Sequence, residues 1–325
     1  MSELQDKVVV LAAGGRIVQK LPDQSELSDE EISAFIPDFL RPMSVFRKWS
    51  FQPVSNYTLN MCADIVHMAK SMIHDEKAKA IVITCAVHAM AELAYFSDLI
   101  WDLNSPLIFT ASIFSSNSPN SETRTRLTQS VTAALSQSTS GKGALICLND
   151  ALYSPADIIR ISNYRRADLQ MFSPLGIYTQ PGGDYIHLRN PRTRNFRTLT
   201  SPIPRNLPIL TAALGSDDLV IRTLAEKAET LDGLILSGLG DGDVPSSWIP
   251  HIRKIIKTNI PIVLTSRYPG GYVQAMEQYE GSASQLIDMG AIPAGLLSPF
   301  HARLRLAVAL ASGMPAEELP NWIRG

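Results

Sequence analysis

Two short apolar runs each lead into residues that could do chemistry. Arg16 comes three residues after the first run, directly after a Gly-Gly pair, and Cys85 and His88 follow the run that ends at Thr84. A guanidinium binds carboxylate, phosphate or sulfate through paired hydrogen bonds. A histidine, with a reference pKa of about 6.5, acts as a general acid or base or binds an anion. A cysteine beside cations has a lowered pKa and can become a nucleophile.

Each of these residues also has an ordinary structural interpretation. Arg16 could form an ion pair with an acidic residue, and Cys85 at a strand end could be a small buried side chain. His88 could cap a helix, and Arg160, in ADIIRI, could be a solvated loop residue. The residue types alone leave both interpretations open.

Other motifs predict less. The segment Gly238–Gly242 (GLGDG) lacks the Gly-Lys-Ser/Thr ending of a phosphate-binding P-loop. Aspartate is common in tight turns, so Asp241 and Asp243 could be turn residues. The 3 cysteines are scattered, and the histidines have no metal-ligand spacing. We therefore expect neither a metal nor a cofactor.

Composition excludes several classes of protein. At roughly 150 residues per domain, a chain of 325 residues forms about two domains. With 29 basic and 31 acidic residues the net charge is −2, so a general binder of nucleic acid or of a membrane surface is not expected. No apolar stretch approaches the roughly 18 residues of a membrane span, and the chain opens without a basic segment before its first apolar run. We expect a cytoplasmic protein.

The elements that would position these residues alternate between strands and helices. Continuous apolar strands indicate a sheet that is buried on both faces, which is typical of a parallel sheet covered by helices. The sequence therefore predicts a doubly wound α/β fold. The expected strands of the first half are Lys7–Ala13, Lys79–Thr84, Pro106–Thr110 and Ala144–Leu148, and the expected helices are Leu59–Ile73, Met90–Leu103 and Arg124–Leu135.

A proline-rich segment, TSPIPRNLP, separates two parts of the chain. We predict an N-terminal domain at 1–200, a linker at 201–208 and a C-terminal α/β domain at 209–325. In the C-terminal part the expected strands are Ile209–Ala213, Gly233–Leu236 and Pro261–Thr265, and the expected helices are Asp217–Lys227, Trp248–Lys257, Leu286–Met289 and His301–Ser312. Within 17–57, a capping-box pair of Ser28 and Glu31 predicts a helix start, and the segment is either a lid or a plain connection.

Four collinear motifs resemble the bacterial-type L-asparaginase family. They are LAAGGRI at Leu11–Ile17, VITCAVHAMAELAYF at Val82–Phe96, DGLILSGLGDGDVP at Asp232–Pro245 and IPIVLTSRYPGGYV at Ile260–Val273. The resemblance implies a flavodoxin-like N-terminal domain and a smaller C-terminal α/β domain. It also implies a homodimer or homotetramer in which a neighbouring subunit completes each site. In that family a threonine nucleophile attacks an amide, and a second Thr–Lys–Asp set activates it.

The resemblance places other residue types at the reacting positions. The nucleophilic threonine corresponds to Arg16, and the second threonine corresponds to Val87. The aspartate that holds the substrate's α-ammonium corresponds to His88, and the lysine corresponds best to Arg160. A guanidinium stays protonated and cannot attack, and valine has no hydroxyl group. Ordinary two-threonine chemistry is therefore not expected.

The remaining site positions also depart from the family pattern. The substrate-binding serine falls near Val54 or Ser55, and no tyrosine precedes Tyr57 to act as the lid tyrosine. Asp241 and Asp243 replace two asparagines, one of which reaches a neighbour's pocket in the family, so they either pair with Arg16 across an interface or form a turn. The Gly14–Gly15 turn is kept, with Gly15 expected to line the substrate site.

Three functions are compatible with these replacements. The first is a repurposed enzyme that acts on a small carboxylate- or amide-containing metabolite through an Arg/His-lined pocket. The second is a catalytically inactive pseudoenzyme that binds a small anion or a protein partner, and the third is residual amidohydrolase activity. Exchanging a hydroxyl, a carboxylate and an ammonium for Arg16, His88 and Arg160 makes the pocket more positive. We therefore expect an anionic ligand without an exposed α-ammonium group.

Overall fold

The computed structural model describes residues 4–20, 23, 25–49, 53–160, 169–171, 174–178, 185–186, 188–191 and 195–324. For 159–160, 169–171 and 185–186 only the backbone is described. The chain divides into two compact units, Met1–Phe196 and Arg197–Gly325. Each unit is an α/β layered structure with its own sheet and its own buried core.

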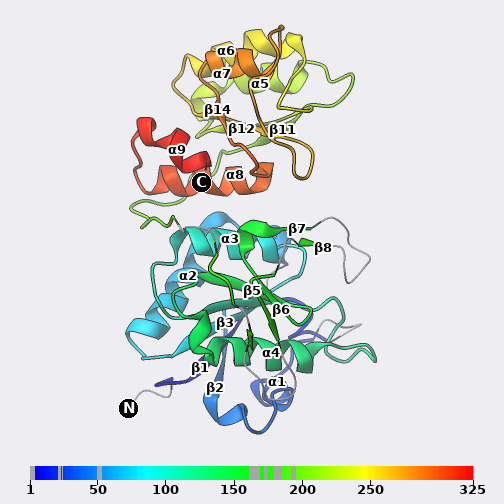
Figure 1. The fold of residues 1–325 in the computed structure, drawn as a ribbon, viewed down its shortest axis with the longest axis vertical. Coiled ribbons are helices and arrows are strands. Elements are labelled where there is room, and N and C mark those ends of the chain that lie inside the picture. The colour runs from blue at the N-terminus through cyan, green and yellow to red at the C-terminus, as the bar shows by residue number, and fades with distance from the viewer. Residues whose placement is uncertain are drawn as a thin grey trace. The chain divides into compact units, whose positions relative to one another are not determined.

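The larger unit is built on an 8-stranded sheet with the order β10-β9-β6-β5-β4-β3-β1-β2 (Figure 1). Its parallel part has the order 2-1-3-4-5, which is the flavodoxin-like order, so the predicted fold class is confirmed. On one side the sheet is extended by antiparallel pairs of β5 with β6, β6 with β9, and β9 with β10. The bounds are β1 Val8–Ala12, β2 Ser44–Lys48, β3 Ala80–Thr84, β4 Leu107–Thr110, β5 Ala144–Leu148, β6 Ala151–Tyr153, β9 Gly176–Tyr178 and β10 Tyr185–Ile186. A separate antiparallel pair joins β7, Ile158–Arg160, to β8, Leu169–Met171.

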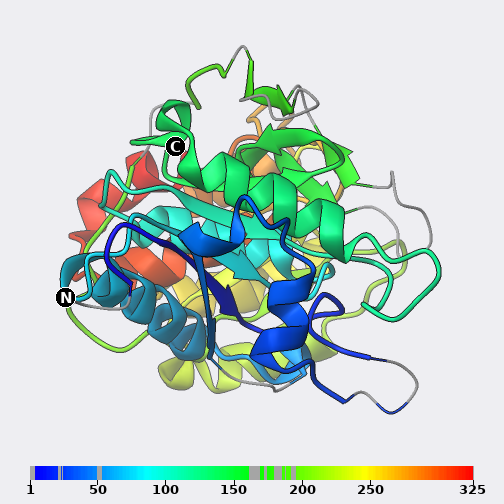
Figure 2. The same cartoon turned by 90° about the horizontal axis from the view of Figure 1, so that it is seen from below.

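The central strands are buried on both faces, as their continuous apolar sequences predict. Every residue of β1, β3, β4 and β5 is buried. The bounds of the helices are α1 Asp29–Ala34, α2 Leu59–His74, α3 Met90–Ile100 and α4 Thr123–Leu135. Figure 1 shows α2 and α3 on one face of the sheet and α1 and α4 on the other, and α4 crosses in front of the sheet in Figure 2. The predicted helices α2, α3 and α4 are therefore confirmed, with α3 ending at Ile100 rather than Leu103.

The crossover from β4 to β5 through α4 differs in handedness from the crossover from β3 to β4 through α3. The sheet order steps in the same direction from β3 to β4 and from β4 to β5, yet α3 and α4 cover opposite faces (Figure 1). The two crossovers therefore have opposite hands, although almost all such connections are right-handed. As a consequence, the loop after β4 passes over the carboxyl ends of the strands to reach α4, which contacts β1, β3, β4 and β5.

The segment 17–57, for which the sequence predicts least, contains the predicted helix start and an unpredicted strand. The hydroxyl of Ser28 accepts from the backbone N–H of Glu31 at 3.2 Å, and the Glu31 carboxylate accepts from the backbone N–H of Ser28 at 2.9 Å. This confirms the predicted capping box, and α1 ends before Pro37. The unpredicted element is β2, which pairs with β1. Its sequence, SVFRK, has only Phe46 buried, so it lacks the apolar run that marks the central strands.

The smaller unit carries a 4-stranded parallel sheet with the order β11-β12-β13-β14. Helices α5, α6 and α7 pack on the face lined by Leu234, Leu236, Ile262 and Leu264, and α8 contacts β11, β12 and β13. The predicted strands and helices are all present, with ends moved by a few residues. The bounds are β11 Ile209–Thr211, β12 Leu234–Gly238, β13 Ile262–Ser266, β14 Ile292–Pro293, α5 Leu219–Glu226, α6 Ile249–Ile256, α7 Ala283–Asp288, α8 Pro299–Ala311 and α9 Leu319–Arg324.

Residues within the proline-rich segment form hydrogen bonds to α8 of the smaller unit. The backbone N–H groups of Thr200 and Ser201 donate to the Ala311 carbonyl at 2.9 and 3.0 Å. The Arg303 side chain donates to the Leu207 carbonyl at 2.9 Å. A linker at 201–208 remains a prediction. In the part of the chain that is described, no helix has the length and apolar character needed to cross a membrane.

A buried histidine makes the smaller unit sensitive to acid. His301 in α8 is 4% exposed, and burial, together with the nearby Arg305, lowers its pKa from 6.5 to about 4. Below pH 6.5 this histidine binds a proton in the unfolded chain but stays neutral in the folded chain. The free energy of unfolding therefore falls as the pH drops from 6.5 towards 4. The full loss is about 3 kcal/mol. Urea unfolding at pH 7 and pH 4.5 measures it.

The control for this prediction is a second histidine. His301→Gln should reduce the pH dependence over this window, whereas Gln at the exposed His67 should leave it unchanged. Equal pH dependence in the wild type and in His301→Gln would contradict the assignment.

Candidate functional site

The two candidate residues Arg16 and His88 flank the point where the strand order reverses. Arg16 lies four residues beyond the end of β1, and His88 lies four residues beyond the end of β3. These strands are parallel neighbours, with Ala12 opposite Thr84. In open α/β sheets ligands bind at the carboxyl ends of the strands, where the order reverses. Both side chains are exposed on this edge.

The turns that carry the two residues are in direct backbone contact. Gly15 has a φ of +88°, and a Cβ atom placed on it would lie 2.2 Å from the Cys85 carbonyl oxygen and 2.8 Å from the Ala86 nitrogen. Only glycine combines this conformation with this approach. The Gly14–Gly15 turn therefore lies against the turn after β3, as a site shared by both loops requires.

Arg16 is held by a main-chain oxygen and not by an acid. Its Nη1 donates to the carbonyl of Ile113, in the loop that follows β4. Within the described residues its guanidinium forms no ion pair. The same loop bonds to the β1 side a second time, because the Ser116 hydroxyl donates to the Gln19 carbonyl at 2.9 Å. Arg16 therefore keeps its positive charge on the edge of the sheet.

The structure argues against Cys85 as a nucleophile. Cys85 is 0% exposed, and its thiol donates a long hydrogen bond to the Thr110 carbonyl oxygen, 4.0 Å from Sγ. Burial, with a smaller contribution from Cys62, raises the pKa of the Cys85 thiol from 9.0 to about 12. The expectation that neighbouring cations lower this pKa is therefore wrong, because desolvation dominates.

We expect Cys85 to resist alkylation in the folded protein. A pKa of about 12 leaves roughly a thousandfold less thiolate at pH 8 than an ordinary cysteine has, and burial also hides the sulfur. Iodoacetamide labelling followed by peptide mass spectrometry measures the rate, with the urea-unfolded chain as the reference. Labelling of Cys85 in the folded protein at the unfolded rate would contradict its burial.

The other predicted site residues lie on three separate segments of the chain. His88 is exposed just before α3, whose first residue follows Ala89, and Ala89 supplies no side-chain cap. Ser55 is exposed in a short 3₁₀ turn, Val54–Asn56, ahead of α2. The backbone of Arg160 lies in β7 opposite Leu169. Its side chain lies outside the described atoms, so its part in the site remains a prediction.

Tyr57 is a residue that the sequence analysis did not place in the site. Its hydroxyl donates to the carbonyl of Ala13 at 3.0 Å, directly before the Gly14–Gly15 turn. Its ring meets Trp49 edge to face, with 5.4 Å between the centroids. Burial, with smaller contributions from Cys85 and Cys62, raises the pKa of the Tyr57 phenol to about 12, so it stays protonated. No local pattern signals a side chain that bonds to a carbonyl 44 residues away.

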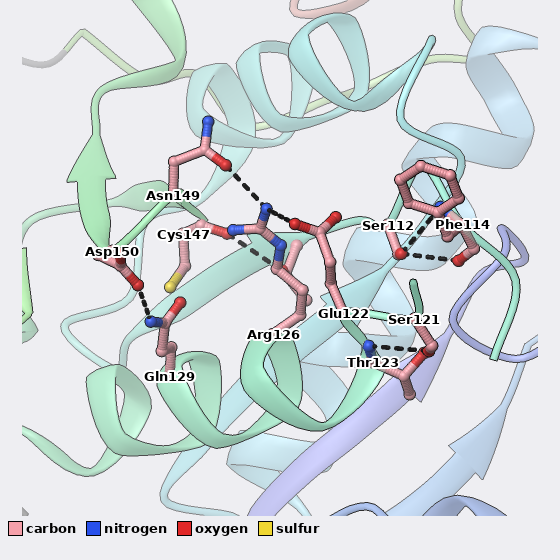
Figure 3. A network of polar contacts seen from close by, with 11 residues as sticks. Ser112, Phe114, Ser121, Glu122, Thr123, Arg126, Gln129, Cys147, Asn149 and Asp150 are labelled. Atoms are coloured by element: carbon pink, nitrogen blue, oxygen red, sulfur yellow. Dashed lines mark hydrogen bonds and ion pairs between the residues drawn. The ribbon is translucent and has the colours of Figure 1, made fainter. Parts of the chain in front are cut away.

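A buried arginine on α4 holds the turn after β5 (Figure 3). Nη2 of Arg126 donates to Glu122 Oε1 at 3.0 Å and to Asn149 Oδ1 at 2.8 Å. Arg126 is only 5% exposed, so this charge depends on its partners. One helical turn further along, Gln129 donates to the carboxylate of Asp150.

The turn that Arg126 and Gln129 hold is a tight hairpin. Asn149 and Asp150 have φ values of 50° and 61° and form the two-residue connection from β5 to β6. Two central residues with positive φ are typical of a type I′ turn. Asn and Asp tolerate this conformation, and Arg126 and Gln129 of α4 hold it through hydrogen bonds to their side chains. The network therefore sets where β6 begins.

The two aspartates after β12 behave as loop residues within their own unit. Asp243 accepts from the Tyr279 hydroxyl at 2.6 Å and from the Ala283 N–H at 2.9 Å, so both of its carboxylate oxygens are engaged. The pKa of Tyr279 is raised to about 12 by its hydrogen bond to Asp243. Asp241 accepts a long bond, 3.4 Å, from Gln274. These contacts favour the turn interpretation, and a pairing with Arg16 of a neighbour stays a prediction.

Comparison with known proteins places the chain in a family. Residues 7–191 match the model of the asparaginase N-terminal domain, and residues 206–323 match the glutaminase/asparaginase C-terminal domain. An L-asparaginase of Bacillus licheniformis is 24% identical over 95% of this chain and 97% of its own length. A glutaminase-asparaginase of Pseudomonas fluorescens biotype A is 24% identical over 96% of this chain and 88% of its own. The crystal structure of a probable cytoplasmic L-asparaginase from Campylobacter jejuni superposes with a TM-score of 0.83 at 18% identity and covers 98% of this chain and 99% of its own. The chain belongs to the asparaginase family.

Proposed function

We propose that this family member binds and converts a small carboxylate- or amide-containing metabolite at the edge between β1 and β3. In this proposal Arg16 binds an anionic group of the ligand and His88 acts as general acid or base. Gly15 and Ser55 line the site, and Arg160 adds a second guanidinium. The observation that carries the proposal is that Arg16 and His88 are both exposed on two turns in backbone contact at the reversal of strand order.

The binding part of the proposal has a direct test. Calorimetric titration with succinate, glutarate and N-acetyl-L-aspartate should show binding to the wild type. Arg16→Gln should abolish it, whereas Arg124→Gln, which changes an exposed arginine on α4 of the same unit, should not. Binding that survives Arg16→Gln would place the ligand elsewhere.

We expect no L-asparaginase activity at rates typical of enzymes. The resemblance places Arg16 and Val87 where the family has its two threonines, and neither side chain can attack an amide. Burial of Cys85 removes the thiol as a substitute. Ammonia release from L-asparagine, measured with a coupled assay, should stay far below about 1 per second. Turnover at or above that rate would refute the proposed loss of threonine chemistry.

A pseudoenzyme is the second candidate function, and the burial of Cys85 favours it. Without that thiol, His88 is the one remaining acid–base candidate of those the sequence singled out. NMR of the purified protein with small amides and N-acyl amino acids separates the candidates. Product formation that is lost in His88→Ala supports an enzyme, and binding without product supports a pseudoenzyme. Slow release of ammonia from an amide in that panel would instead support residual amidohydrolase activity.

The assembly and the compartment are also part of this proposal. By family resemblance we propose a homodimer or homotetramer that works in the cytoplasm. Light scattering should then give a molar mass that is a multiple of 35.6 kDa, and a monomer at micromolar concentration would contradict the assembly.

A further inference from the structure

The loop segments next to the strand ends at the proposed site contain no acidic residue. The residues that directly follow the carboxyl ends of β1, β2, β3 and β4 are 13–18, 49–57, 85–89 and 111–121, and none of these four segments contains Asp or Glu. The connection from β1 to α1 continues to residue 28 and contains Asp23 and Glu26. Two of these segments carry the cationic or protonatable groups Arg16 and His88. This distribution is a property of the site and not of the chain as a whole, because the chain has 31 acidic and 29 basic residues.

The acids that come next along the chain are engaged elsewhere. Asp23 accepts from the Ser25 hydroxyl at 3.0 Å, and Glu26 pairs with Lys48 at 3.6 Å. Glu122, directly after the last of these segments, pairs with the buried Arg126 at 3.0 Å. Asp150, in the turn after β5, accepts from Gln129. Glu92 lies in the first turn of α3, where the helix N-terminus favours a carboxylate. Among the residues that the structure describes, the hydrogen-bond partner of the Arg16 guanidinium is the neutral carbonyl of Ile113.

We infer that the ligand of this site is a small acid without a free ammonium group, such as an unsubstituted dicarboxylate or an N-acylated amino acid. The inference rests on the proposed function, because it describes the ligand of that same site. An ammonium group in the site would find no carboxylate on the four segments next to the strand ends and would be repelled by the Arg16 guanidinium. A carboxylate in the same place would gain a charge-assisted hydrogen bond from the guanidinium.

Binding of matched pairs to the intact protein tests the inference. Monomethyl succinate and L-aspartate carry the same net charge, and only L-aspartate has an ammonium group. N-acetyl-L-aspartate and L-aspartate share a skeleton and differ in whether the amine is blocked. In calorimetric titrations at low salt, the amine-free member of each pair should bind at least about tenfold more tightly. Arg16→Gln should weaken the binding of the amine-free ligands and reduce the ratio of the two affinities within each pair. Arg124→Gln should leave both the affinities and the ratio unchanged.

The outcomes distinguish a wrong ligand class from a wrong site. If L-aspartate binds as tightly as its amine-free partners, and this binding depends on Arg16, the site stands and the ligand class is wrong. If neither these acids nor succinate bind, the proposed function itself fails, and the inference fails with it. A ratio of about tenfold that is lost in Arg16→Gln supports both.

Discussion

Gly15→Ala should destabilise the N-terminal unit by roughly 4 kcal/mol or more, beyond the range of ordinary substitutions. The new Cβ would lie 2.2 Å from the Cys85 carbonyl oxygen, which is a backbone atom that no rotamer change can move aside. The backbone conformation, with a φ of +88°, adds its own strain for an alanine. Urea unfolding followed by circular dichroism measures the loss.

Gly141 provides the matched control for this variant. It has a φ of +71° in the same unit, and its nearest atom to an added Cβ is Asn104 Oδ1 at 3.7 Å. Alanine there should cost only the conformational strain, about 1 kcal/mol. Equal losses for Gly15→Ala and Gly141→Ala would mean that the turns after β1 and β3 are not packed together.

Arg126→Ala should cost about 3–5 kcal/mol, because it leaves the Glu122 carboxylate and the Asn149 amide without their buried cationic partner. Arg126 is 5% exposed and bonds to both groups through Nη2 (Figure 3). The expected effect is a lower urea midpoint with an unchanged slope.

Two further variants test whether the loss comes from the unpaired acid. Arg124→Ala, at an exposed position on the same helix, should change stability by less than about 0.5 kcal/mol. Arg126→Met combined with Glu122→Met should recover much of the loss, because it removes both charges. A double variant as unstable as Arg126→Ala would show that shape, not charge, governs this position.

The architecture could be predicted because it is encoded locally. The runs that became β1, β3, β4 and β5 are apolar without interruption, and a strand needs that pattern only when both of its faces are covered. The helix starts are similarly local, since the Ser28–Glu31 capping box spans four residues. β2 could not be predicted in this way, because an edge strand with one buried residue has no continuous apolar pattern.

The candidate site could be predicted only in part. The Gly14–Gly15 pair and the motifs around residues 82–96 were sufficient to select Arg16, Cys85 and His88. Their chemistry depends on environment, which is a property of contacts distant in sequence. Cys85 and His88 are three residues apart, yet one is 0% exposed and the other is exposed. A strand end lies inside the molecule and the following turn lies outside, and no residue type reveals where that border falls.

The sequence by itself determined the fold class, the absence of acids from the four loop segments and the residue types at the reversal of strand order. Only the tertiary structure decided that Arg16 bonds to the Ile113 carbonyl, that Tyr57 bonds to Ala13 and that Arg126 holds the turn at Asn149. The physical reason is that these partners include backbone carbonyls, which every residue carries. Which carbonyl lies near a given side chain depends on the crossover through α4, whose loop passes over the strand ends, and on the packing of whole elements.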